Sequence, residues 1–171
     1  MDDNLALLRA MAHPLRLRIL SLVTGQAMSA AELARALGCT QANASYHLRV
    51  LATVGQVETA ERVTIRGGQA VRFRYAGRVE DRRGRPLAVE DHLLFASALG
   101  RELERRTALR DRRAMGAATD AELWVRPEHW EEFRAAVMDA SRRLHSRARA
   151  AGAPGTVKTS TTISLFRMLT R

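Results

Sequence analysis

The sequence predicts a mainly α-helical fold with one small β-hairpin, followed by a C-terminal region of helices and strands. Up to about residue 55, apolar residues recur at intervals of three and four, which is typical of short amphipathic helices. Between residues 57 and 75 the period changes to two around Gly67–Gly68, which predicts two strands joined by a glycine turn. With 171 residues, 46% of them hydrophobic, the chain can bury a core as one ordinary domain or two small ones.

Two helices are expected first. One covers residues 4–12 and ends at His13, because the residue before a proline avoids helical geometry. Pro14 fits the first turn of the next helix, which runs to about Gly25.

Two further helices follow, separated by a glycine. Ser29 and Glu32 have the spacing of a capping box, which predicts a helix start at Ser29. Gly38 ends that helix, and Thr40 can cap the next one, predicted over residues 40–53.

The helix predicted over residues 40–53 has two different faces. Ala44, Leu48 and Leu51 form an apolar stripe for packing. The opposite face has short polar or hydrogen-bonding side chains and no apolar anchor: Gln41, Ala42, Ser45, Tyr46 and Arg49. Such a helix is suited to the major groove of DNA, the alternative being an ordinary solvated surface.

The charge of the chain also favours a polyanionic partner. The formal net charge is +10 and the isoelectric point is about 11.4. Lys158 is the only lysine among 28 basic residues, a bias that GC-rich coding or selection for phosphate binding would explain. Arginines flank the predicted hairpin at Arg62, Arg66, Arg72 and Arg74.

Helices, a turn, a polar-faced helix and a basic hairpin together make a winged helix-turn-helix. The segments LLRAMAHPLRLRIL, ELARALGCTQANASYHLRVL and GGQAVRFRYAG resemble the ArsR-type winged-helix repressors of bacteria. The most specific elements are AHPLRLRIL at residues 12–20 and Ser45-x-His47-Leu48-x-x-Leu51. The resemblance covers residues 1–77, and the layout after them is similar to the longer actinobacterial members. It implies a homodimer that binds a palindromic operator.

We therefore expect a dimeric transcriptional repressor that binds a specific sequence of double-stranded DNA. The helix at 40–53 would lie in the major groove and the hairpin at 62–74 against the backbone. His47 is expected to pack or to bond a phosphate. The expected contacts are Thr40, Gln41, Ala42, Asn43, Ser45, Tyr46, His47 and Arg49 on the helix, and Arg62, Arg66, Gly67 and Arg72 on the hairpin. The alternative is a winged-helix module that binds protein and binds DNA weakly or not at all.

No catalytic, metal or cofactor site is expected. Many ArsR-type members bind metal through paired cysteines or spaced Asp/His sets, whereas here Cys39 is the single cysteine. Asp91 and His92 are adjacent, and His129 and His145 lie 16 residues apart. Cys39 is expected to be a small buried side chain, with a redox switch as the alternative. No nucleophile–base or paired-carboxylate set occurs at a usable spacing, so an enzyme is not expected.

Beyond the hairpin, residues 78–87 are expected to be a polar linker and residues 88–171 a region for dimerisation or effector binding. A helix is predicted over 89–113, with packing positions at Leu93, Leu94, Ala96, Leu99, Leu103 and Leu109. Its charged second half is a solvated surface or a phosphate-binding one. The first helix and this long one are expected to pair across a two-fold axis.

The last part of the chain is expected to contain a strand at 122–125, a helix at 128–150 and a strand in the tail that starts at Val157. The two strands are expected to pair. Trp124, Trp130 and Phe133 are candidates for the core of this unit or for an effector pocket that binds a small molecule.

The sequence also gives an expectation about location. Acidic residues stand near the N-terminus where a signal peptide would be positive, and no stretch approaches the roughly 18 apolar residues of a membrane span. We therefore expect a cytoplasmic protein.

Overall fold

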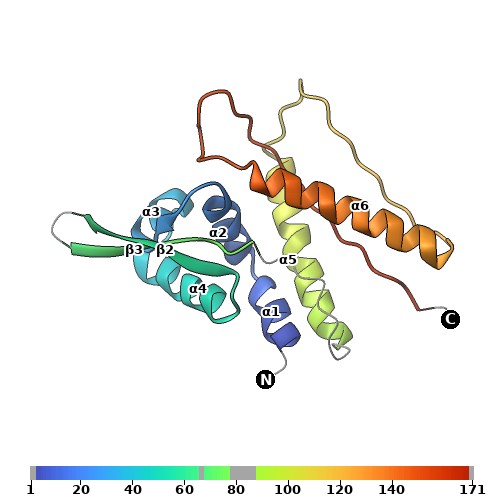
Figure 1. The fold of residues 1–171 in the computed structure, drawn as a ribbon, viewed down its shortest axis with the longest axis horizontal. Helices are drawn as coiled ribbons and strands as arrows, with labels where there is room; N and C mark the ends of the chain where they lie inside the picture. The colour runs from blue at the N-terminus through green and yellow to red at the C-terminus, as the bar shows by residue number, and fades with distance from the viewer. Residues whose placement is uncertain (1–2, 66–67, 78–87, 170–171) are drawn as a thin grey trace.

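The computed structural model describes residues 3–65, 68–77 and 88–169, and in these it has six helices and one three-stranded antiparallel sheet (Figure 1). This confirms the predicted fold class, a winged helix-turn-helix followed by a C-terminal helical region. The elements in chain order are α1 (Asp3–Met11), α2 (Pro14–Gly25), β1 (Met28–Ser29), α3 (Ala30–Leu37), α4 (Gln41–Thr53), β2 (Val57–Ile65), β3 (Gly68–Tyr75), α5 (Val89–Thr107) and α6 (Pro127–Ser146).

The helix caps form where the sequence predicts them. Ser29 and Glu32 make both hydrogen bonds of a capping box at the start of α3. Gly38 ends α3 in the left-handed conformation, with φ of 67°, which an L side chain rarely adopts. Thr40 Oγ1 then accepts a 3.2 Å hydrogen bond from the Asn43 amide at the start of α4. These local signals fix the turn between α3 and α4.

The sheet has the order β1-β3-β2 and contains the predicted hairpin, the wing. Strand β1 was not predicted, because two residues are too short to show a periodic pattern. It pairs Met28 with Phe73 and Ser29 with Arg72, and so joins the wing to the start of α3.

One core holds the first 77 residues together. Ile19 of α2, Leu33 of α3, and Leu48 and Leu51 of α4 are fully buried. Their burial stabilises the fold by roughly 1.5–3 kcal/mol for each side chain. Phe73 and Tyr75 of the wing pack against the same cluster. The core therefore fixes the base of the wing beside α3 and α4.

Both C-terminal helices are shorter than predicted. Helix α5 ends at Thr107 rather than at residue 113. Just beyond it, Asp111 Oδ1 accepts a 2.9 Å hydrogen bond from the Arg113 amide, a local bond that competes with helix. Helix α6 ends at Ser146 rather than at residue 150, and none of its residues is buried.

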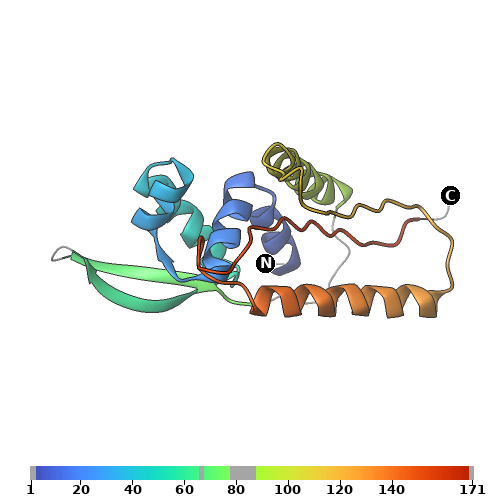
Figure 2. The ribbon, with the colours of Figure 1, turned by 90° about the horizontal axis from the view of Figure 1, so that it is seen from above.

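The strand pairing predicted for the C-terminal region is wrong. Residues 122–125 and 157–169 form no strand, and both run as extended chain (Figure 2). Leu123, Trp124 and Val125 are exposed, as are Val157 and Phe166. Strand preference measures how well a side chain fits a half-buried pleated surface, and the chain offers these segments no such surface.

The packing face of α5 also differs from the prediction. The helix buries Asp91, Ala98 and Glu102, and Leu99 is half-buried. The other predicted packing leucines are exposed: Leu93, Leu94 and Leu103, and Leu109 beyond the helix end. Asp91 accepts a 2.8 Å hydrogen bond from Arg9 of α1, and Glu102 pairs with Arg105 at 2.8 Å. The Arg9–Asp91 pair joins α5 to α1, whereas the Glu102–Arg105 pair lies within α5 itself, and the exposed leucines of α5 remain uncovered.

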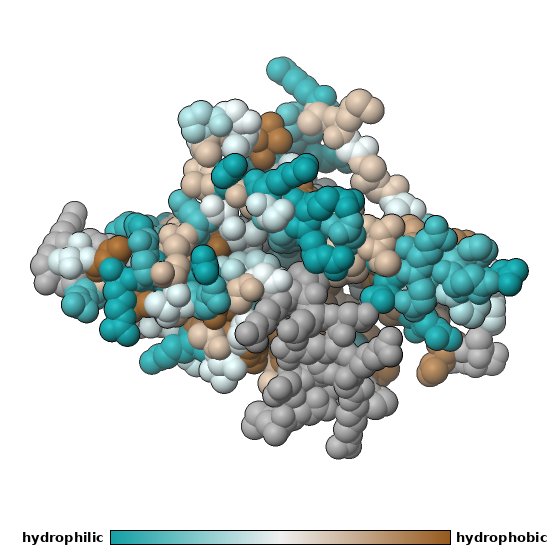
Figure 3. All heavy atoms as spheres, in the orientation of Figure 1, coloured by the Kyte–Doolittle hydropathy of each residue, from teal (hydrophilic) through white to brown (hydrophobic). Residues whose placement is uncertain are grey.

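The remaining contacts of the C-terminal segments are few. Arg106 donates a 3.3 Å hydrogen bond to the carbonyl of Thr161, and the backbone at Arg149 lies against Gly25, where an added Cβ would come within 2.1 Å of its carbonyl oxygen. In Figure 3, apolar side chains reach the surface around the C-terminal end of the chain.

The predicted linker at 78–87 lies outside the described residues. In the parts that are described, no helix is long and apolar enough to span a membrane.

Candidate nucleic-acid interface

Helix α4 presents the polar face that its sequence predicts. Ala44, Leu48 and Leu51 are buried in the core. Of the predicted contact residues, Ser45 is half-buried and the others on that face are exposed, together with the cap and first turn: Thr40, Gln41, Ala42, Asn43, Tyr46 and Arg49. Figure 1 shows α4 packed under the base of the wing, which extends well beyond the helices. Helix α4 and the wing are therefore neighbours in the fold.

His47 lies inside the domain rather than on the contact face. It is 5% exposed, and its ring lies against that of His13, with centroids 4.6 Å apart and the ring planes tilted by 43°. Burial lowers the pKa of both histidines, and nearby Arg16 lowers them further. We correct the expectation that His47 contacts DNA. The burial of His47 could have been predicted from the sequence, because the spacing of Ala44, His47, Leu48 and Leu51 places them on one face of the helix.

Tyr46 is the large exposed side chain of α4. It is 53% exposed and meets His47 edge-on at 5.1 Å. It also borders a surface hollow of about 360 Å³, beside Arg16 and Val50. Arg16 donates a 2.9 Å hydrogen bond to the Arg9 carbonyl, which closes the α1–α2 corner behind the tyrosine. Sequence reasoning did not find Arg16, since its partners are backbone carbonyls that no side-chain pattern reveals.

Free arginines flank the polar face. Arg49 on α4 and Arg62 on β2 are exposed, and neither makes an ion pair with any described residue. Exposed guanidinium groups without an internal partner are suited to phosphate binding. Arg66 and Gly67, also predicted as contacts, lie outside the described residues.

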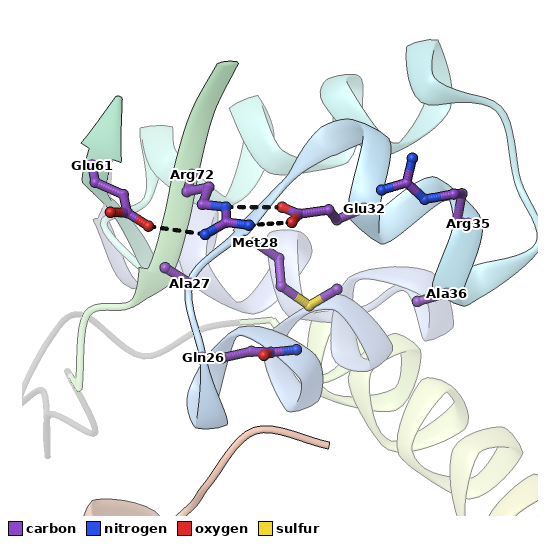
Figure 4. Close-up of a pocket in the computed structure, with 8 residues that line it drawn as sticks. All are labelled: Gln26, Ala27, Met28, Glu32, Arg35, Ala36, Glu61 and Arg72. Carbon is purple, nitrogen blue, oxygen red and sulfur yellow. Dashed lines mark hydrogen bonds and ion pairs between the residues drawn. The ribbon is translucent and has the colours of Figure 1, made fainter. Parts of the chain in front are cut away.

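Arg72 has internal partners instead. Its Nε donates a 3.1 Å hydrogen bond to Glu32, its Nη2 makes a second one to the same carboxylate, and its Nη1 lies 3.2 Å from Glu61 (Figure 4). The Arg72 hydrogen bonds lower the pKa of Glu32 from 4.5 to about 2. We therefore correct the expectation that Arg72 contacts DNA, because its guanidinium is already occupied.

The predicted effector residues are not enclosed by the chain. Trp124 is 88% exposed and Phe133 52% exposed, while Trp130 is half-buried on α6. The prediction that they form a core is wrong for the single chain, because Trp124 and Phe133 are exposed. Cys39 is half-buried against the core cluster. Within the described residues, no three His, Cys, Asp or Glu side chains are grouped so as to hold a metal ion.

Comparison with known families agrees with this geometry. A family model described as a helix-turn-helix domain matches residues 11–59, from the last residue of α1 to the third residue of β2. The chain contains a helix-turn-helix domain. The match includes both α3 and α4, the pair whose second helix carries the exposed polar face. No curated protein matches the chain.

Proposed function

We propose that this protein is a sequence-specific transcriptional regulator that binds operator DNA as a homodimer and represses transcription. The observation that carries the proposal is the polar, exposed face of α4, the second helix of the helix-turn-helix. The resemblance of residues 1–77 to ArsR-type repressors supports the direction of control.

In the proposed complex α4 lies in the major groove. Gln41 is at the first turn, where its amide can make two hydrogen bonds to an adenine, and Ser45 is one turn further on. Arg49 lies in the third turn, from which its long side chain reaches a phosphate. Arg62 of the wing meets the neighbouring backbone. Helix α4 thereby reads bases and also holds the backbone through Arg49, and the wing adds a second backbone contact.

The homodimer is supported by the outer face of α5. Five residues spaced by four, three, four and three lie along one side of that helix, and all are exposed: Val89, Leu93, Ala96, Gly100 and Leu103. The small residues in the middle would let a second helix approach closely, since a Cβ added to Gly100 meets nothing within 4 Å. A second copy of α5, with α1 alongside, would cover this stripe.

The dimer gives the operator its geometry. Two copies of α4 related by a two-fold axis would read two half-sites about one helical turn apart, roughly 34 Å. We also propose a small-molecule effector site formed by Trp124, Trp130 and Phe133. The partner subunit or the ligand itself would cover these side chains.

Selection from a pool of random duplexes tests this function. The protein is incubated with the pool at about 0.15 M salt, because a chain of charge +10 binds any duplex in dilute buffer. We expect the bound fraction to converge on a palindrome with half-sites one turn apart. A pool that stays random after repeated rounds would contradict the proposal and favour a winged helix that binds protein.

A further inference from the structure

The wing contains an irregularity that brings one particular carboxylate to Arg72. Strand β2 pairs Thr59 with Phe73 and then Glu61 with Arg72, so Ala60 is an extra residue, a β-bulge. Without it, Ala60 would lie opposite Arg72 and Glu61 would lie on the other face of the sheet. Bulges commonly re-aim a side chain in this way.

Arg72 lies on the central strand, β3, and has a paired residue on each side. Ser29 of β1 is its neighbour on one side and Glu61 of β2 on the other. Above the same face, Glu32 comes from the first turn of α3 and takes two hydrogen bonds from the guanidinium (Figure 4). A two-point bond between planar groups fixes both distance and orientation.

Glu32 is itself held rigidly. Its Oε2 accepts the Ser29 amide at 2.7 Å and the Ser29 hydroxyl at 2.8 Å, as part of the α3 capping box. Helix α3 in turn packs on α4 across the Gly38 turn. An unbroken series of contacts therefore runs from the wing through Arg72 and Glu32 to the helix that carries the polar face.

We propose that Arg72 and Glu32 are positioning residues that fix the wing at the angle needed for it to reach the DNA backbone while α4 occupies the groove. This inference rests on the proposed DNA-binding function. Arg72 touches no DNA in it; the pair acts by holding Arg62 and the rest of the wing in place.

The wing offers a matched control. Arg74 pairs with Glu58 directly across the same two strands at 2.7 Å. That pair is well exposed, at 62% and 49%, whereas the Arg72 and Glu32 side chains are 32% and 21% exposed. Since Arg74–Glu58 joins only the two strands of the wing, its loss should leave the angle between wing and α4 unchanged.

The test compares Glu32→Gln with Glu58→Gln on two duplexes. Glutamine keeps the capping-box geometry at position 32 but removes the charge. One duplex contains only the selected half-sites, and the other adds the flanks that the wings would reach. We expect Glu32→Gln to weaken binding to the flanked duplex by about fivefold, which is about 1 kcal/mol, and to leave binding to the short duplex unaffected. Glu58→Gln should bind both as the wild type does.

Arg72→Gln and the double variant complete the test. If the two residues act through one contact, the double variant should lose no more affinity for the flanked duplex than Arg72→Gln alone. Additive losses of affinity in the double variant would overturn the inference. So would a Glu32→Gln variant that loses the same affinity for both duplexes. Circular dichroism melting confirms that each variant is folded at the assay temperature.

A readout without DNA separates this inference from the proposed function. Spin labels at Ala36→Cys on α3 and Gln69→Cys on β3, in a Cys39→Ser background, report the distance between helix and wing. Glu32→Gln should broaden that distance distribution and Glu58→Gln should not. If Glu32→Gln leaves the distance distribution unchanged, the positioning role is overturned. If Glu32→Gln broadens the distribution but the wild-type protein binds no duplex specifically, only the DNA-binding proposal is contradicted.

Discussion

The two parts of this chain use apolar residues in opposite ways. In residues 3–77 the helical stripes of α2, α3 and α4 turn inward and form one buried core. In residues 88–169 they turn outward: α5 buries two acidic residues and an alanine, α6 buries nothing, and the extended segments expose Trp124 and Phe166. The first part buries its apolar stripes within the single chain, whereas the second leaves most of its large apolar side chains exposed.

This difference has a thermodynamic meaning. A helix with no buried face is marginal in water, because most helical stability in proteins comes from packing. Helix α6 should therefore open at a lower free energy than α3 or α4, as local unfolding units do. A partner copy that covers the α5 stripe would raise the stability of the second part and barely change the first.

The largest expected effect is in the core of the first part. Leu33→Ala, at a fully buried position of α3, should lower the free energy of unfolding by about 2–5 kcal/mol. Leu109→Ala, in the exposed chain after α5, should change it by less than about 0.5 kcal/mol. Urea denaturation followed by circular dichroism measures both. Equal losses would mean that the two parts share one core.

The apolar stripe of α5 gives the next prediction. Leu93→Glu places like charges near each other across the proposed two-fold axis and should weaken dimerisation by at least about tenfold. Light scattering coupled to size-exclusion chromatography gives the mass. Leu109→Glu is the matched control, since it adds the same charge away from the stripe and should leave a dimer. A wild-type protein that is monomeric at micromolar concentration would remove the basis of this prediction.

Recognition should lie entirely in the first part. Gln41→Ala should lower the binding free energy for the preferred base at one position by about 1–3 kcal/mol and so relax specificity at that position. Arg49→Ala should weaken binding to every sequence and reduce the salt slope by about one. Fluorescence anisotropy over a salt series with single-base variants separates the two effects. If Gln41→Ala were to weaken all sequences equally, α4 would not be reading bases.

The smallest effect is a dependence of stability on pH that also belongs to the first part. The folded state lowers the pKa of His13 and His47 below 6.5, so the unfolded chain binds protons more readily and stability falls as the pH drops below about 6.5. Glu32, with its pKa lowered from 4.5 to about 2, stabilises the fold above pH 4.5 and loses that contribution toward pH 2.

Urea midpoints between pH 8 and pH 3 measure this dependence. His47→Gln should flatten the curve just below pH 6.5, and Glu32→Gln should flatten it only below pH 4.5. A stability that rises on acidification through pH 6.5 would show that the histidines are not held neutral.

The first part could be predicted closely from sequence because its signals are local. Ser29–Glu32, Gly38 and Thr40 set the helix ends within a few residues of chain, and the period-two pattern set the wing. The errors arose where a tertiary contact decides. Arg72 was predicted to be free because its partner Glu32 is 40 residues away and Glu61 faces it only through a bulge.

The second part could not be predicted in the same way. Leu93 and Leu103 were assigned to packing, and the residues at 122–125 to a strand, because apolar pattern indicates burial without saying what covers it. Where a second chain buries an apolar surface, the apolar pattern of the sequence predicts burial that the structure of one chain does not show. The exposed leucines of α5 are therefore informative, since they mark the surface on which a second copy is proposed to lie.

The central claim is that α4 reads DNA sequence, and fluorescence anisotropy against duplexes tiled across the protein's own promoter, at about 0.15 M salt, tests it most directly. The account predicts that one tile binds at least about a thousandfold more tightly than a scrambled duplex of the same composition, and that Gln41→Ala reduces this ratio. Equal, weak binding to every tile and to the sequence selected from the random pool would contradict it.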